Sequence, residues 1–316
     1  MTKNNKYNLI FIGTPDFSVP TLQALISDER FSVSTVITAP DAKVGRKQIV
    51  TAPPVKVIAE KNNIPVLQPK NIKSLPLALR EGGLGVKVDA IVTIAYGQII
   101  PQEILDIPKF GCLNLHASLL PKYRGASPIQ SAILNNEKET GVTLMKMDKG
   151  MDTGDIITQE KISIDSRETG ESLHNKLSEL SANVLKKYLV DYLEEKLKPV
   201  AQDNSQATIA KKLTRDSGKI DWNKSAEEVE CMVRAYYPWP GTHTSWNNKT
   251  LKIIKVDLLK QKNHQTGEIF LENNQLAIQC KTNALLINQL QLEGKKVMTA
   301  KEFLTGNKDI VGYILK

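Results

Sequence analysis

The sequence predicts an α/β protein of two domains, a doubly wound Rossmann-like domain followed by a smaller β-barrel domain of the OB type. Three observations lead to this prediction. Short apolar segments alternate with amphipathic helical stretches through the first half of the chain. From residue 211 onward one strand pattern follows another, with turn residues between them. The 316 residues also exceed the usual size of one domain.

The first domain is predicted to span residues 1–199. The run VDAIVTIA at 88–95 has the continuous apolar character of a central parallel strand that is covered on both faces. Amphipathic stretches predict short helices at Phe17–Ile26 and Val55–Lys61. The predicted strands are Asn8–Ile12, Ser32–Thr38, Ile64–Leu67, Val88–Ala95, Gly111–His116 and Gly141–Met147.

A long helix closes the first domain. Apolar residues recur every three or four positions within Glu171–Leu197, which predicts one buried helix face, and Pro199 stops the pattern. The next residues, 200–210, are small, polar and aperiodic, so they are predicted to be a linker.

The second domain is predicted to span residues 211–316. Ser225 and Glu228 have the spacing of a capping box, which predicts a helix that ends before Pro238. Strands and turns follow, and a small antiparallel barrel accounts for them most simply. The predicted strands are Thr250–Leu258, Gly267–Leu271, Leu276–Cys280 and Ala284–Leu290.

Positive charge is concentrated in the second domain. The whole chain carries +8, and residues 211–316 hold 17 Lys and Arg against 11 Asp and Glu, a net +6. Such a domain suits a polyanionic partner such as nucleic acid, although a lysine-rich solvated surface is the simpler alternative.

Other bulk features exclude several classes of protein. No apolar run approaches a membrane span and no leader pattern stands at the N-terminus, so a cytoplasmic protein is expected. The three cysteines are widely spaced and form no metal-binding pattern, so neither disulfides nor a metal site is expected. The first strand leads into a single glycine, Gly13, rather than the glycine-rich motif of a dinucleotide site.

The residues best suited to chemistry end the predicted strand at 111–116. Asn114 and His116 alternate along that strand, so their side chains point to the same side. Open α/β sheets bind ligands outside the carboxyl ends of their strands, which is where this pair lies. Three aspartates follow in a later glycine-rich loop, and their spacing does not select among them: Asp148, Asp152 and Asp155.

An amide, an imidazole and a carboxylate together suit the transfer of an acyl-like group between nitrogens. His116 can donate to a carbonyl oxygen or relay a proton near neutral pH, and Asn114 supplies a fixed amide donor. An aspartate can orient the imidazole. The alternative is structural, because a single histidine near a strand end often has a packing role and aspartates beside glycine often form turns.

The segments around these residues resemble the signature of enzymes that use 10-formyltetrahydrofolate as a formyl donor. The resemblance rests on Asn114-x-His116-x-Ser118-Leu-Leu-Pro121-x-x-Arg124-Gly125 and on Asp152-Thr-Gly154-Asp155. Further segments, spread over nearly the whole chain, are similar to methionyl-tRNA formyltransferases: Phe11–Phe17, Pro128–Gln130, Glu139–Thr143, Lys219–Trp222 and Arg234–Pro240.

This resemblance implies roles for particular residues. Asn114, His116 and Asp152 are the implied catalytic trio. The implied co-substrate is 10-formyltetrahydrofolate, and no metal is implied. The residues implied to contact the folate are Ser118, Leu119, Leu120, Pro121, Tyr96 and Gly97.

The family also has a basic loop that reaches the acceptor stem of tRNA, and residues 40–48 resemble it. The usual Arg-Pro of that loop is replaced here by Ala42-Lys43, although the loop stays basic. A plain solvated loop is the alternative. The residues expected to contact tRNA are Lys43, Arg46 and Lys47 in this loop and Lys211, Lys212 and Arg215 in the second domain, where Lys252 and Lys255 could also follow its phosphates.

The implied function is formylation of methionyl initiator tRNA by a monomer. Two alternatives share part of the pattern. A formyltransferase for an amino sugar nucleotide or a purine precursor would share the trio without needing a basic second domain. A non-catalytic tRNA-binding protein would need the basic surface but not the intact trio.

Overall fold

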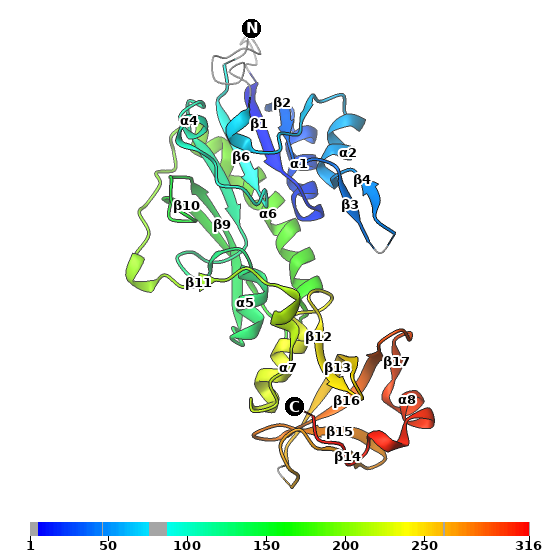
Figure 1. Ribbon diagram of the computed structural model, residues 1–316. Helices are drawn as coiled ribbons and strands as arrows, with labels where there is room; N and C mark the ends of the chain where they lie inside the picture. Colours follow the sequence, from blue (N-terminus) through cyan, green and yellow to red (C-terminus); the bar gives the residue numbers. More distant parts are fainter. Residues whose placement is uncertain (1–5, 46, 76–86, 262, 316) are drawn as a thin grey trace. The chain divides into compact units, whose positions relative to one another are not determined.

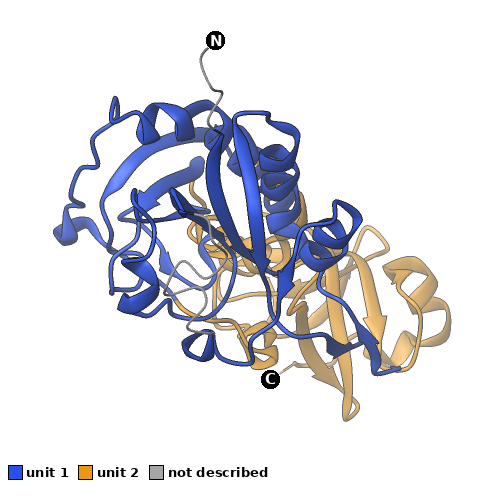
Figure 2. Cartoon of the chain, turned by 90° about the horizontal axis from the view of Figure 1, so that it is seen from above, with its two compact units in different colours: residues 1–128, 139–163, 174–210 blue, residues 129–138, 164–173, 211–316 orange. Residues whose placement is uncertain are grey.

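The computed structural model describes residues 6–45, 47–75, 87–261 and 263–315 (Figure 1). The chain forms two compact units, each gathered from segments that are not continuous in the sequence (Figure 2). Unit 1 comprises Met1–Pro128, Glu139–Ser163 and His174–Ala210. Unit 2 comprises Ile129–Lys138, Ile164–Leu173 and Lys211–Lys316.

Unit 1 is built on a seven-stranded sheet in the order β10-β9-β7-β6-β1-β2-β5. The strands from β7 to β5 are parallel, and β9 and β10 are antiparallel to their neighbours. The predicted α/β class with a Rossmann-like sheet is confirmed. The bounds are β1 Tyr7–Gly13, β2 Phe31–Ile37, β5 Val66–Leu67, β6 Ala90–Ile94, β7 Cys112–His116, β9 Glu139–Lys146 and β10 Ile156–Ser163.

The central strand β6 is buried along its whole length, as its apolar sequence predicts. It lies between β1 and β7, so the carboxyl ends of three parallel strands meet at one sheet edge. The described α-helices of the first 200 residues are α1 Val19–Ser27, α2 Pro54–Lys61, α4 Gln102–Leu105, α5 Pro128–Leu134 and α6 Gly170–Leu193. The short strands are β3 Ala42–Val44, β4 Ile49–Thr51, β8 Arg124–Gly125 and β11 Ile209–Ala210.

The long helix α6 ends four residues before the predicted Leu197. Glu195 adopts a left-handed conformation with φ 60°, and the amide of Lys196 donates back to the carbonyl of Asp191 at 2.8 Å. This arrangement caps the free carbonyls of the last turn, so the helix ends before Pro199 is reached.

The segment 200–210, predicted to be a linker, makes regular contacts with unit 1. Val200 forms an antiparallel bridge with Ile156, and β11 pairs in parallel with β8. The side chain of Gln202 is buried. The composition is that of a loop, but long-range pairing fixes the segment to the sheet edge.

Unit 2 contains an antiparallel sheet in the order β12-β13-β16-β15-β14, with β17 paired to β16. The predicted capping box is present, since Ser225 Oγ accepts from the Glu228 amide at 3.2 Å and Glu228 Oε2 accepts from the Ser225 amide at 2.9 Å. Trp222, Trp246 and Phe303 lie in the apolar core. The bounds are α7 Ala226–Ala235, β12 Thr242–Trp246, β13 Lys249–Leu259, β14 Ile269–Glu272, β15 Gln275–Gln279, β16 Ala284–Leu292, β17 Met298–Thr299 and α8 Ala300–Gly306.

The three cysteines are free and buried. Burial raises the pKa of the Cys112 and Cys280 thiols to about 12, so both stay protonated at pH 8. Because the thiolate is the reactive form, we expect neither to react with an aromatic disulfide reagent at pH 8 until the protein is unfolded. A thiol titration with and without guanidinium measures this, and rapid labelling of native Cys112 would contradict it.

Among the described residues, no helix has the length and apolar composition needed to cross a bilayer.

Candidate active site

The strand β7 presents Asn114 and His116 on one face of the sheet, because alternate residues of a strand point the same way. Thr93 of β6 lies opposite Asn114, and Thr143 of β9 lies opposite His116. Asn114 is partly exposed, whereas His116 is 6% exposed. The strand register therefore places an amide and an imidazole side by side at the carboxyl end of the parallel strands.

The imidazole of His116 lies between two hydrogen-bond acceptors. Its Nε2 is 2.9 Å from the carbonyl oxygen of Tyr123, and its Nδ1 is 3.5 Å from Oδ2 of Asp152. A carbonyl oxygen and a carboxylate oxygen are both hydrogen-bond acceptors, so each ring nitrogen faces an acceptor. These two contacts fix the orientation of the ring.

Asp152 is held in place by the backbone of the β8 turn. Its Oδ2 accepts a hydrogen bond from the Gly125 amide at 2.8 Å, and its own backbone is left-handed with φ 55°. Asp148 instead accepts from Gly150 and Thr153 within its own loop. Asp155 is exposed. Of the three aspartates that the spacing left open, Asp152 is the one in contact with His116.

A buried glutamine, Gln202, holds the backbone of the Asp152 loop in place. Gln202 Nε2 donates to the carbonyl oxygens of Asp152 at 2.9 Å and Gly154 at 2.7 Å. Its Oε1 accepts from Arg124 at 2.7 Å, and the same guanidinium donates to Asn204 at 2.8 Å. Gln202 is not predicted from the sequence, because it stands in an aperiodic polar stretch where no local signal marks it.

Replacing Gln202 by leucine is expected to lower kcat about 10²-fold, because a displacement of about 1 Å of a catalytic group costs that much. The leucine has a similar volume but cannot hold the carbonyls of Asp152 and Gly154 or accept from Arg124. Exposed Gln206 of the same segment gives the matched control, and Gln206→Leu should keep parental activity. Steady-state kinetics measure both variants. Parental kcat in Gln202→Leu would show that the contact does not position Asp152.

The stretch expected to contact folate forms a tight turn after β7. Ser118 is fully buried, and its hydroxyl donates to the carbonyl oxygen of Lys122 at 2.6 Å. Thr143 Oγ1 donates to the Ser118 carbonyl and accepts from the Leu120 amide, which ties the turn to β9. Leu119 and Pro121 are partly exposed, whereas Leu120 is buried. The exposed members of the turn are therefore the ones that can touch a ligand.

Two buried hydroxyls near this edge have no hydrogen-bond partner among the described residues, those of Tyr96 and Thr93. Burial also raises the pKa of the Tyr96 phenol, which keeps it a neutral donor. Gly97 has φ 81°, and no atom lies within 4 Å of the position that a Cβ would occupy. Buried polar atoms without partners suit a ligand that supplies hydrogen-bonding groups. Thr93 is not predicted from the sequence, because it lies within an apolar run.

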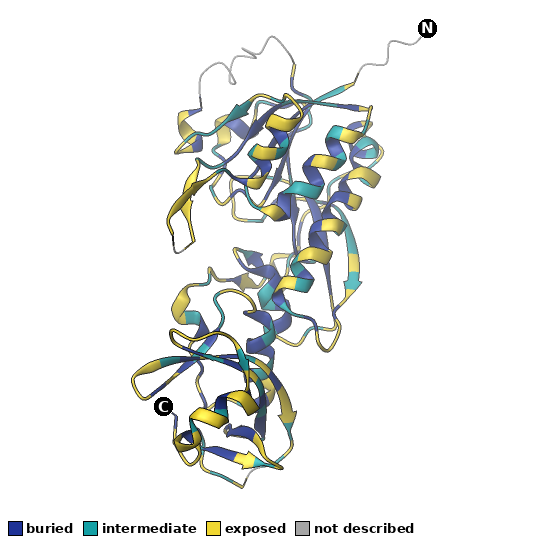
Figure 3. Ribbon diagram, turned by 90° about the vertical axis from the view of Figure 1, so that its right-hand side faces the viewer, coloured by how far each residue is buried: buried dark blue, intermediate teal, exposed yellow. Residues whose placement is uncertain are grey.

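The basic residues expected at a tRNA interface are exposed where the structure describes them. Lys43 lies on β3 and Lys47 in the turn of the β3–β4 hairpin, whose strands are exposed throughout (Figure 3). Arg46 lies outside the described residues. The residues of unit 2 in this set, which are also exposed, are Lys211, Lys212 and Arg215. Among the described residues, no cluster of three or more His, Cys, Asp or Glu could hold a metal ion.

Two family models match the chain. The model described as "Formyl transferase" matches residues 7–189, and the model described as "Formyl transferase, C-terminal domain" matches residues 212–308. The fold and the site thus define a formyl-group transferase.

Within this class, the chain belongs to the methionyl-tRNA formyltransferase family. The methionyl-tRNA formyltransferase of Halalkalibacterium halodurans is 45% identical over 301 residues, which cover 94% of each chain. That of Caldanaerobacter subterraneus subsp. tengcongensis is 42% identical over 309 residues, 98% of this chain and 99% of the relative.

Solved structures show the same fold. An N-formyltransferase from Helicobacter canadensis, in complex with folinic acid and dTDP-3-aminofucose, is 23% identical with a TM-score of 0.66 and covers 89% of this chain and 98% of its own. A methionyl-tRNA formyltransferase from Clostridium thermocellum is 17% identical with a TM-score of 0.55 at the same coverage.

Proposed function

We propose that this protein transfers the formyl group of 10-formyltetrahydrofolate to the α-amino group of methionyl initiator tRNA. The product is N-formylmethionyl-tRNA, which serves translation initiation. The observation that carries the proposal is the position of the His116 ring between Tyr123 and Asp152, beside Asn114 at the sheet edge. The relatives, whose sequences are 42–45% identical over nearly the whole chain, are named methionyl-tRNA formyltransferases, and these names indicate the acceptor.

The three side chains divide the work of moving the formyl group between nitrogens. The Asn114 amide donates to the carbonyl oxygen that gains negative charge, and protonated His116, whose Nε2 faces the Tyr123 carbonyl, stabilises that oxygen by its positive charge. Asp152 orients His116 through Nδ1 and accepts, through water, the proton that the attacking amine loses. That proton passes to the folate nitrogen as its bond to the formyl carbon breaks and tetrahydrofolate leaves. No serine or cysteine nucleophile takes part in this scheme, and no metal is needed.

The folate co-substrate supplies the one-carbon unit at the formyl oxidation level. The groups on this chain that would hold it are the exposed members of the turn at 118–121, Leu119 and Pro121, together with Tyr96 and Gly97. The Tyr96 hydroxyl, which lacks a partner within the described residues, supports this assignment.

The tRNA partner is assigned from charge. Lys43, Arg46 and Lys47 would contact the acceptor stem, and the exposed cations Lys211, Lys212 and Arg215 would contact phosphates elsewhere on the tRNA. We expect the enzyme to work as a monomer in the cytoplasm. Sedimentation of the purified protein measures its oligomeric state.

A formylation assay with 10-formyltetrahydrofolate and purified tRNA tests the function. We expect turnover with methionyl initiator tRNA, much less with methionyl elongator tRNA, and none with a dTDP-linked amino sugar. The KM for tRNA should rise steeply with salt while the KM for folate changes little, because counterions are released only from the tRNA phosphates. Formylation of the amino sugar without formylation of tRNA would overturn the proposal.

A further inference from the structure

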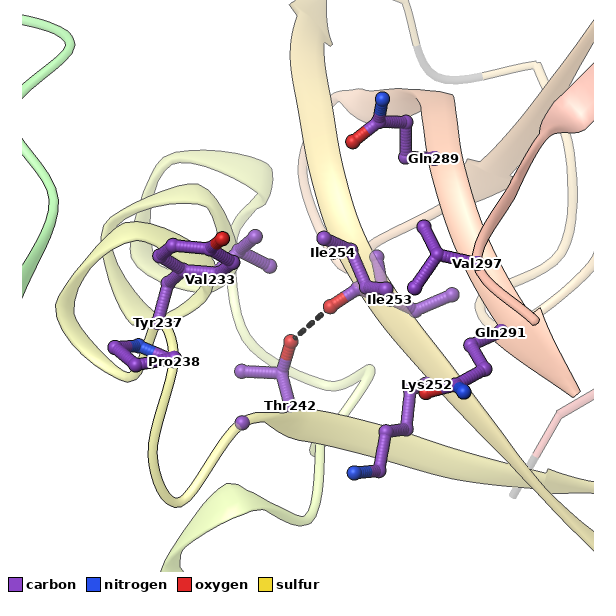
Figure 4. Close-up of a pocket in the computed structure, with 11 residues that line it drawn as sticks. Val233, Tyr237, Pro238, Thr242, Lys252, Ile253, Ile254, Gln289, Gln291 and Val297 are labelled. Atoms are coloured by element: carbon purple, nitrogen blue, oxygen red, sulfur yellow. Dashed lines mark hydrogen bonds between the residues drawn. The ribbon is translucent and has the colours of Figure 1, made fainter. Parts of the chain in front are cut away.

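A cavity of about 200 Å³ lies in unit 2 between the residues that follow α7 and the strands β13 and β16 (Figure 4). Tyr237 and Pro238 lie on one side of it, and Ile254 and Val297 lie on the other. Its volume is below the roughly 300–1,000 Å³ of pockets that hold whole small-molecule ligands. The cavity therefore suits one flat ring held between an aromatic wall and an aliphatic wall.

A β-bulge shapes this cavity. Ile253 pairs with Leu290 and Lys255 pairs with Gln289, so Ile254 is an extra residue on β13. A bulge redirects a side chain and increases the local twist of the strand. Ile253 and Ile254 both line the cavity as a result.

Amide groups supply the polar part of the lining. The Gln289 amide is exposed and has no hydrogen-bond partner among the described residues. Gln291 donates its Nε2 to the Lys295 carbonyl at 2.8 Å, which fixes the orientation of its amide group. An amide offers a donor and an acceptor side by side, the arrangement that reads the edge of a nucleobase.

A line of paired residues that contains two lysines leads across the sheet to this cavity. Lys219 forms a bridge with His243, His243 pairs with Lys252, and Lys252 pairs with Gln291. Directly opposed residues share a sheet face, so these side chains lie in line. Burial and the adjacent Lys252 lower the pKa of His243, with Lys219 adding to the effect and Asp216 opposing it. Lys252 has no acidic partner among the described residues, so its charge is available to a phosphate.

We propose that this cavity binds one unstacked nucleotide of the tRNA, with its base between Tyr237 and Val297 and its backbone phosphate on Lys252. Single-stranded RNA bases are recognised in this way, by stacking on a side chain and by hydrogen bonds to the base edge. The inference rests on the proposed function, because that function supplies the tRNA, and it adds a specific subsite to a general basic surface.

A cavity-filling substitution tests the subsite. Val297→Phe places a ring in the space reserved for the base, and Val311→Phe, at another exposed valine of unit 2, is the matched control. Direct binding of the full-length protein to methionyl initiator tRNA should weaken about tenfold in Val297→Phe, the scale of one lost base stack, and stay parental in the control. The rate at saturating tRNA and the KM for folate should stay within about twofold of the parent.

A second substitution and a second probe complete the test. Gln289→Ala, which leaves the walls intact, should also weaken tRNA binding, whereas Gln275→Ala, at an exposed glutamine outside the cavity, should not. Parental affinity in both Val297→Phe and Gln289→Ala would overturn the subsite while leaving formylation by the parent intact. Free AMP is titrated in parallel. If AMP binding is lost in Val297→Phe but tRNA binding is not, the cavity serves a free nucleotide and the RNA assignment is wrong.

Discussion

Replacing Asp152 by asparagine is expected to lower the single-turnover rate of formyl transfer by about 10²–10⁴-fold, the range for removal of a general acid–base group. The asparagine can still accept from the Gly125 amide, but it removes the negative charge 3.5 Å from His116 Nδ1. His116 then loses the charged partner that the proposed mechanism gives it, and no carboxylate remains to take the proton of the attacking amine. Rapid mixing with saturating tRNA and folate measures the chemical step directly.

The neighbouring loop provides the control for this experiment. Asp155→Asn changes the same charge three residues away on an exposed side chain and should keep the parental rate. The single-turnover rate should also fall in His116→Ala and in Asn114→Ala, because these two groups and Asp152 act on one reacting centre. Near-parental rates in all three would refute the site.

The second large effect is expected from Gly125→Ala. Gly125 has φ 114°, and an added Cβ would lie 2.6 Å from the carbonyl oxygen of Ala210 on β11. The backbone of β8 must then move, which breaks the hydrogen bond from the Gly125 amide to Asp152. We expect a loss of about 3 kcal/mol in unfolding free energy, the upper end for a strained residue, together with a loss of activity.

Gly294→Ala is the control that separates two contributions to the loss of stability: the steric clash of the new Cβ with Ala210, and the cost of a positive φ for alanine. Gly294 also has a positive φ, 75°, but nothing lies within 4 Å of its Cβ position. It should lose about 1–2 kcal/mol from the left-handed conformation alone and keep full activity. Urea unfolding and kinetics on both variants make the comparison. Equal stabilities and equal activities would mean that β11 does not hold β8 in place.

The sequence predicts the positions of Asn114 and His116 well because strand alternation is a local rule. The choice of Asp152 over Asp148 and Asp155 is not local, since it depends on the Gly125 amide 27 residues away. Gln202 could not be found at all, because glutamine in a polar stretch normally points to solvent and only long-range pairing buries it here. Local periodicity thus predicts which face a residue takes, and tertiary pairing decides which partner it meets.

The same distinction holds for the fold. The apolar run at 88–95 predicts a buried strand and the capping box at Ser225 predicts the start of a helix, both from local sequence. The structure contains both, as β6 and α7. The end of α6 was predicted at Leu197 from Pro199, but the left-handed Glu195 ends the helix earlier. The hairpin β3–β4 gave no strand signal, because its six residues are all exposed and lack the alternation that burial of one face produces.

The pairing of β11 with β8 sets a limit on dissecting the protein. A fragment that stops at residue 199 would lack both the glutamine that supports the aspartate loop and the strand that buttresses the glycine turn. It could retain most of its sheet and still be inert. Any recombinant catalytic fragment, or any chimera that exchanges the carboxyl-terminal half, should therefore be joined after Ala210.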